Sequence, residues 1–425
     1  MLATALSLML LCAPLKVLTL ADALSTAARG QPHVRQMRAR TVSARARADE
    51  ARAPLLPAVA ASVSYSRQTG NYVPGSTSGS NLKLSPSGAS FDYWNAGIGI
   101  SQTLWDGTGK LSAWLAAREV AAAQSEVEHA SWLDVAKNVR DQFLVAHTNR
   151  ALVEVARDNL ARLEKHLAQI GGYVKIGTRP GIDLAHAKSD RAYGEYQLIS
   201  AVSTYEASKA QLNRAIGIEG PIDYDVSDEA VAPVHNEEAP LAALLDEAYR
   251  ARPELKGARR IVAAQRHDVA AAKATYGPSL TASAGFVEAG TLSAGLVWNW
   301  NIGLNLNWQM FQGMLSPALT REATANLDDA SAQLLMVRQQ VRLDVEQATI
   351  AVRSAKASMI SAHEVMTNAG LRLRLAEERY QIGIGNVIEL ADAQSAHAQA
   401  ASLVVVADYN LGAARAQLVW ALGRD

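Results

Sequence analysis

Two hydrophobic periodicities alternate along the chain and predict two kinds of element. Residues 110–170 and 318–369 contain neither glycine nor proline, and apolar residues recur in them at spacings of three and four. That spacing is the period of an amphipathic helix. At about 1.5 Å per residue, a helix over the first run would be about 90 Å long. No compact domain has that diameter, so we expect each long helix to form an antiparallel hairpin with the helix after it, covered by further copies of itself.

A second pattern, the alternation of apolar and polar residues, precedes each long helix and predicts strands. Residues 300–310 alternate throughout, 96–104 do so nearly throughout, and segments after Pro57 and Pro278 supply partner strands. The polar positions of 300–310 are Asn and Gln rather than Lys and Glu. This pattern suits a strand with lipid on one side and a water-filled lumen on the other, for which about 9–11 tilted residues suffice. The alternative is a soluble antiparallel sheet with its tryptophans in a core.

Four such strands cannot close a barrel alone. Open sheet edges would leave backbone groups unsatisfied in lipid, and the smallest closed barrels need about eight strands. The strands must therefore be pooled between subunits; two subunits would supply eight and three would supply twelve, and counting does not choose between them. Aromatic residues near the predicted strand ends match the aromatic bands of membrane interfaces, and these residues are Trp94, Trp298, Trp300 and Trp308.

The chain is an internal repeat of domain size. Trp94 falls on Trp300 and Gly217 on Gly423 at one constant offset without a gap, and the extra length of the first half lies in a Gly/Ser/Asn-rich stretch, 70–90, read as a longer loop. The predicted organisation is an export segment (1–17), a first repeat (18–217) with a helix, strands 58–68 and 93–105 and helices 110–171 and 181–217, a linker (218–240), and a second repeat (241–425) with a helix, strands 279–288 and 295–310 and helices 316–379 and 386–422. The glycines at 171–172 and at 370 are expected to break the long helices.

Composition and motif searches exclude several classes of function. Lys+Arg and Asp+Glu both number 41, so the net charge is zero and gives no electrostatic case for nucleic acid. The single cysteine, Cys12, leaves the rest of the chain without disulfides or Cys-based metal sites. None of the nine histidines stands in a His-x-x-x-His pair, and no nucleophile elbow or phosphate loop is complete. We therefore expect no enzyme activity, cofactor or metal.

The N-terminus has the character of an export signal. Residues 2–13 form an apolar run that is too short to span a bilayer and resembles the apolar region of a secretory signal, although a basic segment before it is missing. The alternative is a buried first helix turn. Leu11 stands where a lipid-attachment motif needs a small residue, so Cys12 is not expected to carry a lipid anchor.

Several motifs resemble those of one membrane-protein family. In order, they are Leu18-Thr19-Leu20-Ala21-Asp22-Ala23-Leu24, Leu104-Trp105-Asp106-Gly107, Arg252-Pro253-Glu254-Leu255, Ala274-Thr275-Tyr276-Gly277-Pro278-Ser279-Leu280, and Arg379-Tyr380-Gln381-Ile382-Gly383 followed by Ile388-Glu389-Leu390. Over essentially its whole mature length the chain is similar to TolC-type outer-membrane efflux proteins, the outer membrane factors. The resemblance implies an α+β membrane protein in which three protomers share a transmembrane β-barrel, four strands from each, continuous with a long α-helical barrel, and in which the linker contributes to a belt.

The resemblance also implies a function and partners. A homotrimer in outer-membrane lipid would extend into the periplasm and conduct substrates passively from an inner-membrane pump, of RND or ABC type, through a periplasmic adaptor to the outside. One alternative keeps this fold but serves ABC-driven type I protein secretion, and another is a non-channel coiled-coil scaffold. The alternation over 300–310 disfavours the scaffold. Neither the cargo nor the pump and adaptor can be read from the chain.

The resemblance places adaptor docking at the two hairpin tips. The matching positions are Gly177, Thr178, Arg179 and Pro180 in the first half and Gly383, Gly385 and Asn386 in the second. Where some family members have a tip arginine that latches the mouth, this chain has Gly385, which puts that latch in doubt unless Arg179 replaces it. The tip glycines also have a simple structural use, because glycine commonly ends a helix.

Beside the tips, four residues match positions that line the narrow entrance in the family. Tyr380 resembles the gate tyrosine. Glu389 and Asp392 share a helix face at a spacing of three residues, and carboxylates from three subunits would ring the pore and favour cations. Asp183 is the first-half counterpart of Glu389, whereas the counterpart of Asp392 is His186. The alternative for these acids is an ordinary solvated helix face.

Overall fold

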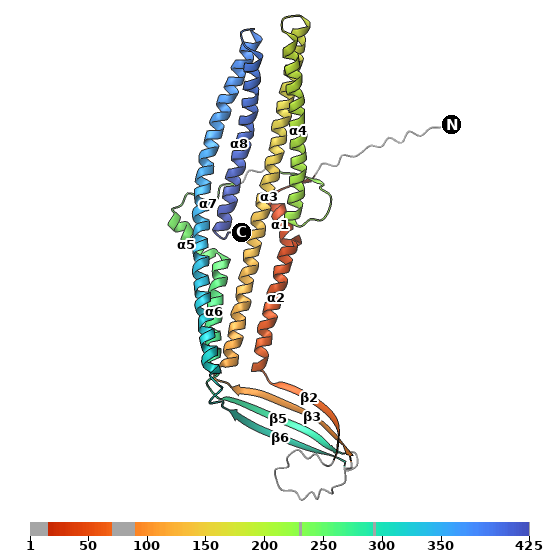
Figure 1. Ribbon diagram of the computed structural model, residues 1–425, viewed down its shortest axis with the longest axis vertical. Coiled ribbons are helices and arrows are strands. Elements are labelled where there is room, and N and C mark those ends of the chain that lie inside the picture. The colour runs from red at the N-terminus through yellow and green to blue at the C-terminus, as the bar shows by residue number, and fades with distance from the viewer. Residues whose placement is uncertain (1–15, 70–89, 229–231, 292–294, 425) are drawn as a thin grey trace, which may run out of the picture. The chain divides into compact units, whose positions relative to one another are not determined.

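The computed structural model describes residues 16–69, 90–228, 232–291 and 295–424, and each half of the chain supplies a sheet segment followed by a long helical hairpin (Figure 1). The first half contains β1 (Lys16–Leu18), α1 (Leu20–Gly30), α2 (Pro32–Arg52), the 3₁₀ turn η1 (Ala53–Leu55), β2 (Ala58–Thr69), β3 (Ser90–Trp105), α3 (Gly109–Lys175) and α4 (Gly181–Ile216). The second contains β4 (Tyr224–Val226), α5 (Leu241–Ala251), α6 (Pro253–Ala274), β5 (Ser279–Thr291), β6 (Gly295–Asn307), α7 (Leu315–Gln381) and α8 (Val387–Ala421). Most of the predicted export segment and the predicted loop at 70–90 lie outside the described residues.

Two compact units make up the chain. The first contains Met1–Ala39, Glu126–Lys256 and Met336–Asp425, and the second contains Arg40–Ser125 and Gly257–Leu335. In the first unit, α3 pairs with α4 and α7 with α8 as antiparallel hairpins (Figure 1), and β1 pairs with β4 in parallel. The second unit holds a four-stranded antiparallel sheet of order β2-β3-β5-β6.

The buried core of the first unit repeats with the sequence. One cluster packs α1, α3 and α4 around β1 and β4, and a second packs α5, α7 and α8. Equivalent positions of the two clusters, each at most 1% exposed, are Ala23 with Leu244, Ala27 with Ala248, Val139 with Val345, Leu212 with Leu418, and Ile216 with Leu422. Small and branched side chains at these sites let helices approach closely at interior packing density.

The register of the sheet gathers its large apolar side chains on one face. Ile98 of β3 lies opposite Phe286 of β5, which lies opposite Trp300 of β6. Val59, Ile302 and Leu304 are among the exposed members of this face, with 67%, 75% and 70% of their surface accessible. Successive side chains of a strand point to opposite faces, so the residues between them, such as Asn301 and Asn305, form a polar face. This arrangement is the one expected for a lipid-facing surface and a lumen.

Three expectations about element ends were wrong. The alternation predicted a strand to residue 310, but β6 ends at Asn307, which pairs with Ser279, the first residue of β5. Beyond that pair the indole N–H of Trp308 donates to the Tyr276 carbonyl oxygen (3.1 Å). α3 passes through the glycines at 171–172, and α7 passes through Gly370. A helical glycine costs only about 1 kcal/mol relative to alanine, which the fully buried Ile170 beside the first pair readily offsets.

A buried ion-pair network ties the segment before α5 to α7 and α8. The carboxylate of Glu237 lies 2.7 Å from the Lys356 ammonium and 3.1 Å from the Arg415 guanidinium, with 7% of its side chain exposed. Burial raises the pKa of Glu237, but the hydrogen bonds from Arg415 and Lys356 outweigh burial and lower that pKa to about 2. The neighbouring Glu238 also contacts Lys356, yet its side chain is 83% exposed.

We predict that Glu237→Gln lowers the free energy of unfolding at pH 7 by about 1–3 kcal/mol, the range for hydrogen bonds to charged groups. The folded pKa lies below the ordinary value of 4.5, so the ionised carboxylate stabilises the fold fully above about pH 4.5, and this contribution disappears as the pH falls towards 2. Thermal unfolding of the wild type and of Glu237→Gln should therefore show that the difference between their stabilities shrinks as the pH is lowered from 7 to 3. Glu238→Gln is the control and should cost much less; equal losses for the two variants would contradict the assignment.

Candidate functional site

The first hairpin tip, between α3 and α4, is a tight turn closed by its own backbone. Gly177 has a left-handed φ of 76°, and its N–H donates to the Val174 carbonyl (3.1 Å). The Thr178 N–H and hydroxyl both donate to the Tyr173 carbonyl, at 3.0 and 2.9 Å. Pro180 stands directly before α4, where its missing N–H costs nothing. The residues predicted for this tip thus form one ordered turn.

The second tip, between α7 and α8, closes in the same way around a different carbonyl. Gly383 has a φ of 87°, and the N–H groups of Ile384 and Gly385 both donate to the Arg379 carbonyl, at 3.1 and 2.9 Å. Asn386 caps α8, because its side-chain oxygen accepts from the Ile388 N–H (3.2 Å). Both glycines are required here, Gly383 by its left-handed backbone and Gly385 by the close approach described next.

Gly385 sits against the end of α7 too closely for any side chain. A Cβ atom at this position would lie 2.7 Å from the Tyr380 nitrogen and 2.9 Å from the Arg379 carbonyl carbon. Both are backbone atoms, which cannot move aside without opening the turn. This contact explains why an arginine does not stand at this position, where some members of the family that the chain resembles carry a latch.

Arg179 of the first tip reaches the end of α7 and covers Tyr380. Its guanidinium carbon lies 4.5 Å from the centroid of the Tyr380 ring, and its Nη2 donates to the Tyr380 carbonyl oxygen at 3.3 Å. His166 of α3 meets the same ring edge-on, with centroids 5.7 Å apart. A guanidinium over an aromatic face contributes about 0.5–2 kcal/mol. Arg179 therefore joins the two hairpins where Gly385 cannot.

Tyr380 is buried in this joint with its hydroxyl unpaired. The residue is 4% exposed, and among the described residues the hydroxyl oxygen has no hydrogen-bond partner. Burial raises the pKa of Tyr380; the positive charge of Arg179 lowers it and the negative charge of Asp183 raises it again. Asp183, at the start of α4, is itself only 6% exposed. The structure thus brings together three of the predicted tip and entrance residues.

The two remaining acids lie elsewhere on α8. Glu389 and Asp392 are exposed, and Glu389 makes an ion pair with Arg379 (3.5 Å) across its own hairpin. Sequence reasoning missed Arg379 and His166. Their spacing along the chain carries no signal of these contacts, since one lies across a turn and the other on a separate hairpin.

The aromatic residues of the sheet form two groups, one in the half of the sheet that contains Trp94 and Trp298 and one at the other end of the strands. Trp298 and Trp300 are about two-thirds exposed, Phe286 stacks on Trp298 (6.2 Å), and Trp94 lies 4.9 Å from Tyr65. The other group contains Trp308 and Trp105, at the end of β3, which was not predicted. From Trp94 to Trp105 the strand rises about 36 Å, or about 28 Å across a membrane at a tilt of about 40°. That is close to the thickness of a hydrocarbon core.

None of the helices in the described residues combines the length and apolar character needed to cross a membrane. Within the same residues, no three His, Cys, Asp or Glu side chains are grouped as metal ligands would be.

Comparisons with known proteins agree with this geometry. The family model described as "Outer membrane efflux protein" matches residues 23–218 and 244–424. Protein CyaE of Bordetella pertussis is 24% identical over 382 residues, which are 89% of this chain and 78% of that protein. The toluene efflux pump outer membrane protein TtgC of Pseudomonas putida is 23% identical over 354 residues, 81% of this chain and 70% of that protein.

Solved structures share the fold. The crystal structure of CusC has a TM-score of 0.82 at 17% identity and covers 96% of this chain and 92% of CusC. The outer membrane protein VceC of Vibrio cholerae has a TM-score of 0.80 at 18% identity, with 95% and 96% of the two chains covered. These likenesses confirm the predicted fold class.

We predict that Gly385→Ala loosens the second tip, because the new methyl group displaces the backbone of Tyr380. Hydrogen exchange of the peptide that contains residues 379–389 should accelerate by at least about tenfold, since a loss of about 1.4 kcal/mol in local stability has that effect.

Gly172→Ala is the matched control for this change. A Cβ atom at Gly172 meets nothing within 4 Å, and alanine favours a helix. In Gly172→Ala, hydrogen exchange of the peptide that contains residues 379–389 should therefore stay at the wild-type rate or fall. Unchanged exchange in Gly385→Ala would contradict the close-approach argument.

Proposed function

Because the chain belongs to the outer membrane efflux protein family, we propose that it is the outer-membrane channel of a tripartite efflux system. It passively conducts substrates from an inner-membrane pump, through a periplasmic adaptor, to the outside. Family membership confirms the predicted location in the outer membrane with an extension into the periplasm, and a role as a channel rather than an enzyme. It also excludes the alternative of a non-channel scaffold.

The exposed apolar face of the sheet carries the proposal. On this face Ile302, Leu304 and Leu306 are each about 70% exposed, and both edge strands, β2 and β6, have one partner each. In water such a surface would be an aggregation site. In a membrane it faces lipid, and the two edges pair with neighbouring protomers; three copies supply the twelve strands of a barrel with a lumen. The polar face, with Asn301 and Asn305, lines that lumen.

Efflux of small molecules is favoured over protein secretion by the relatives. TtgC of Pseudomonas putida is described as a toluene efflux pump component, and ArpC of the same species, 23% identical, as part of an antibiotic efflux pump. These descriptions concern those proteins and support, for this chain, a cargo of small organic molecules. The pump and the adaptor are proposed as classes, with docking at the tips around Gly177 and Gly383.

The joint at the hairpin tips is proposed as the gate. Arg179 holds the first hairpin to Tyr380 at the end of α7, so separation of the hairpins must break this contact. Asp183 lies buried beside Tyr380, whereas Glu389 and Asp392 are exposed and available to ring the entrance. Carboxylates from three protomers around a pore would concentrate cations there.

The lipid-facing surface is tested by a pair of adjacent substitutions. Ile302→Arg places a charge in lipid and should cost about 2–4 kcal/mol at the bilayer centre, whereas Asn301→Arg places the same charge in the lumen. We expect Ile302→Arg to form no heat-resistant oligomers in the outer membrane. It should also fail to restore efflux to a deletion strain. Asn301→Arg should still assemble. Normal assembly of both Ile302→Arg and Asn301→Arg would contradict the proposal, and so would a wild-type chain that restores no efflux.

The gate is tested by single-channel recording in lipid bilayers. Arg179→Ala should raise the open probability because it removes the contact between hairpins, and Tyr380→Phe should lower it because it removes an unpaired buried hydroxyl and keeps the ring. Lys175→Ala, an exposed cation of the same tip, should behave as wild type. The double variant Glu389→Ala, Asp392→Ala should weaken block by multivalent cations about tenfold.

Two outcomes of these recordings would reject the gate. Equal open probabilities for the Arg179 and Lys175 variants would show that the guanidinium does not hold the hairpins together. Unchanged cation block in the double variant would show that the acids of α8 lie away from the conducting path.

A further inference from the structure

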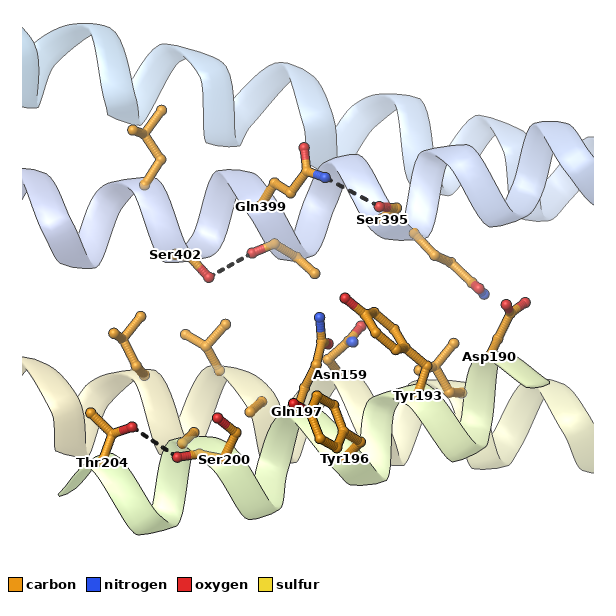
Figure 2. Close-up of a pocket in the computed structure, with 18 of the residues that line it drawn as sticks. Asn159, Asp190, Tyr193, Tyr196, Gln197, Ser200, Thr204, Ser395, Gln399 and Ser402 are labelled. Carbon is orange, nitrogen blue, oxygen red and sulfur yellow. Dashed lines mark hydrogen bonds between the residues drawn. The ribbon is translucent and has the colours of Figure 1, made fainter. Parts of the chain in front are cut away.

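A cavity of about 780 Å³ lies between α3, α4 and α8, and none of the residues proposed above for the gate lines it. Figure 2 shows Asp190 and Tyr193 of α4 directed towards α8, with Asn159 of α3 beside them and Ser395 and Gln399 on the facing helix. The larger aliphatic side chains of the lining are Leu152, Val155, Leu163, Leu403 and Val406, and most of the other lining residues are polar. A concave surface that combines apolar side chains with polar groups is the usual setting of a small-molecule site.

The charge of the cavity has one sign. Among the described residues that line it, Asp190 is the only acidic or basic one. Its neighbour in sequence, Arg191, is held by Glu195 (2.7 Å) and Glu164 (3.7 Å). Burial lowers the pKa of the nearby His166, so that ring is neutral at pH 7 and does not balance Asp190. The cavity therefore favours a positively charged occupant.

Two tyrosines on the same helix add an aromatic surface. Tyr193 and Tyr196 stack with their ring centroids 6.4 Å apart, and 63% and 66% of their surfaces are exposed. Aromatic faces attract cations and stack on planar apolar rings. A pair of exposed tyrosines next to an acid thus suits a cation that carries an aromatic body.

We infer that this cavity binds amphiphilic organic cations that carry an aromatic body. Asp190 contacts the charge, and Tyr193 and Tyr196 contact the rings. Passage of these cations through the channel rests on the proposed efflux function, whereas their binding to the cavity does not.

The test is a binding titration of ethidium, a permanent aromatic cation with amino groups, to the full-length protein in lipid nanodiscs, followed by fluorescence polarisation. Asp190→Asn should weaken binding about tenfold, and Tyr193→Ala or Tyr196→Ala about three- to tenfold. Asp158→Asn, an exposed acid of α3 outside the cavity, is the charge control and should bind as wild type.

Binding and efflux are then compared in order to separate the two proposals. Wild-type protein that does not bind ethidium, or Asp190→Asn that binds it as tightly as the Asp158 control, overturns the cavity assignment even if cells still export ethidium. Binding that depends on Asp190, in a chain that restores no efflux to a deletion strain, upholds the cavity and overturns the proposed function. Loss of both binding and ethidium efflux in Asp190→Asn, with assembly intact, supports both.

Discussion

The structure depends on one constraint, that backbone N–H and C=O groups in hydrocarbon must find partners. The sheet of β2, β3, β5 and β6 is internally paired but ends in two edges, and each unsatisfied group in lipid would cost several kcal/mol. A protomer that turns its apolar face to lipid is therefore incomplete alone. The same pleat that places Phe286 and Trp300 outwards places Asn301 inwards, so closure of the edges also creates a polar lumen.

Much of the fold could be predicted because its signals are periodic and local. The alternation over 300–310 fixed the faces of β6, and the repeat located both hairpins. The end of β6 could not be predicted from its own alternation, since it depends on the register with β5, whose first residue, Ser279, pairs with Asn307. The continuation of α3 through the glycines at 171–172 could not be predicted either, because it depends on the packing of Ile170 against the other hairpin. The cavity at Asp190 assembles three helices from both halves, and no local pattern reports it.

The hairpin joint combines opposing contributions of similar size. Arg179 over Tyr380 contributes about 0.5–2 kcal/mol, while the unpaired buried hydroxyl costs about 1–3 kcal/mol. The polar contributions of the joint thus nearly cancel, and the aliphatic packing of Leu373, Leu390 and Ala393 adds apolar burial around them. A partner that binds the separated hairpins therefore has little polar stabilisation to overcome. A gate needs that property, and a purely structural interface would gain from pairing the hydroxyl.

The two hairpin tips carry different residues at equivalent positions of the repeat, so the joint between them is asymmetric. At the repeat offset that aligns Gly177 with Gly383, Arg179 falls on Gly385 and Tyr380 on Val174. The first tip has a long cation, and the second has a glycine whose backbone packs on Tyr380. An arginine in both tips would open the second turn, whereas glycine in both would leave Tyr380 uncovered. The two halves therefore share their core positions, such as Val139 and Val345. They differ at the tips, where Arg179 of one hairpin contacts the end of the other.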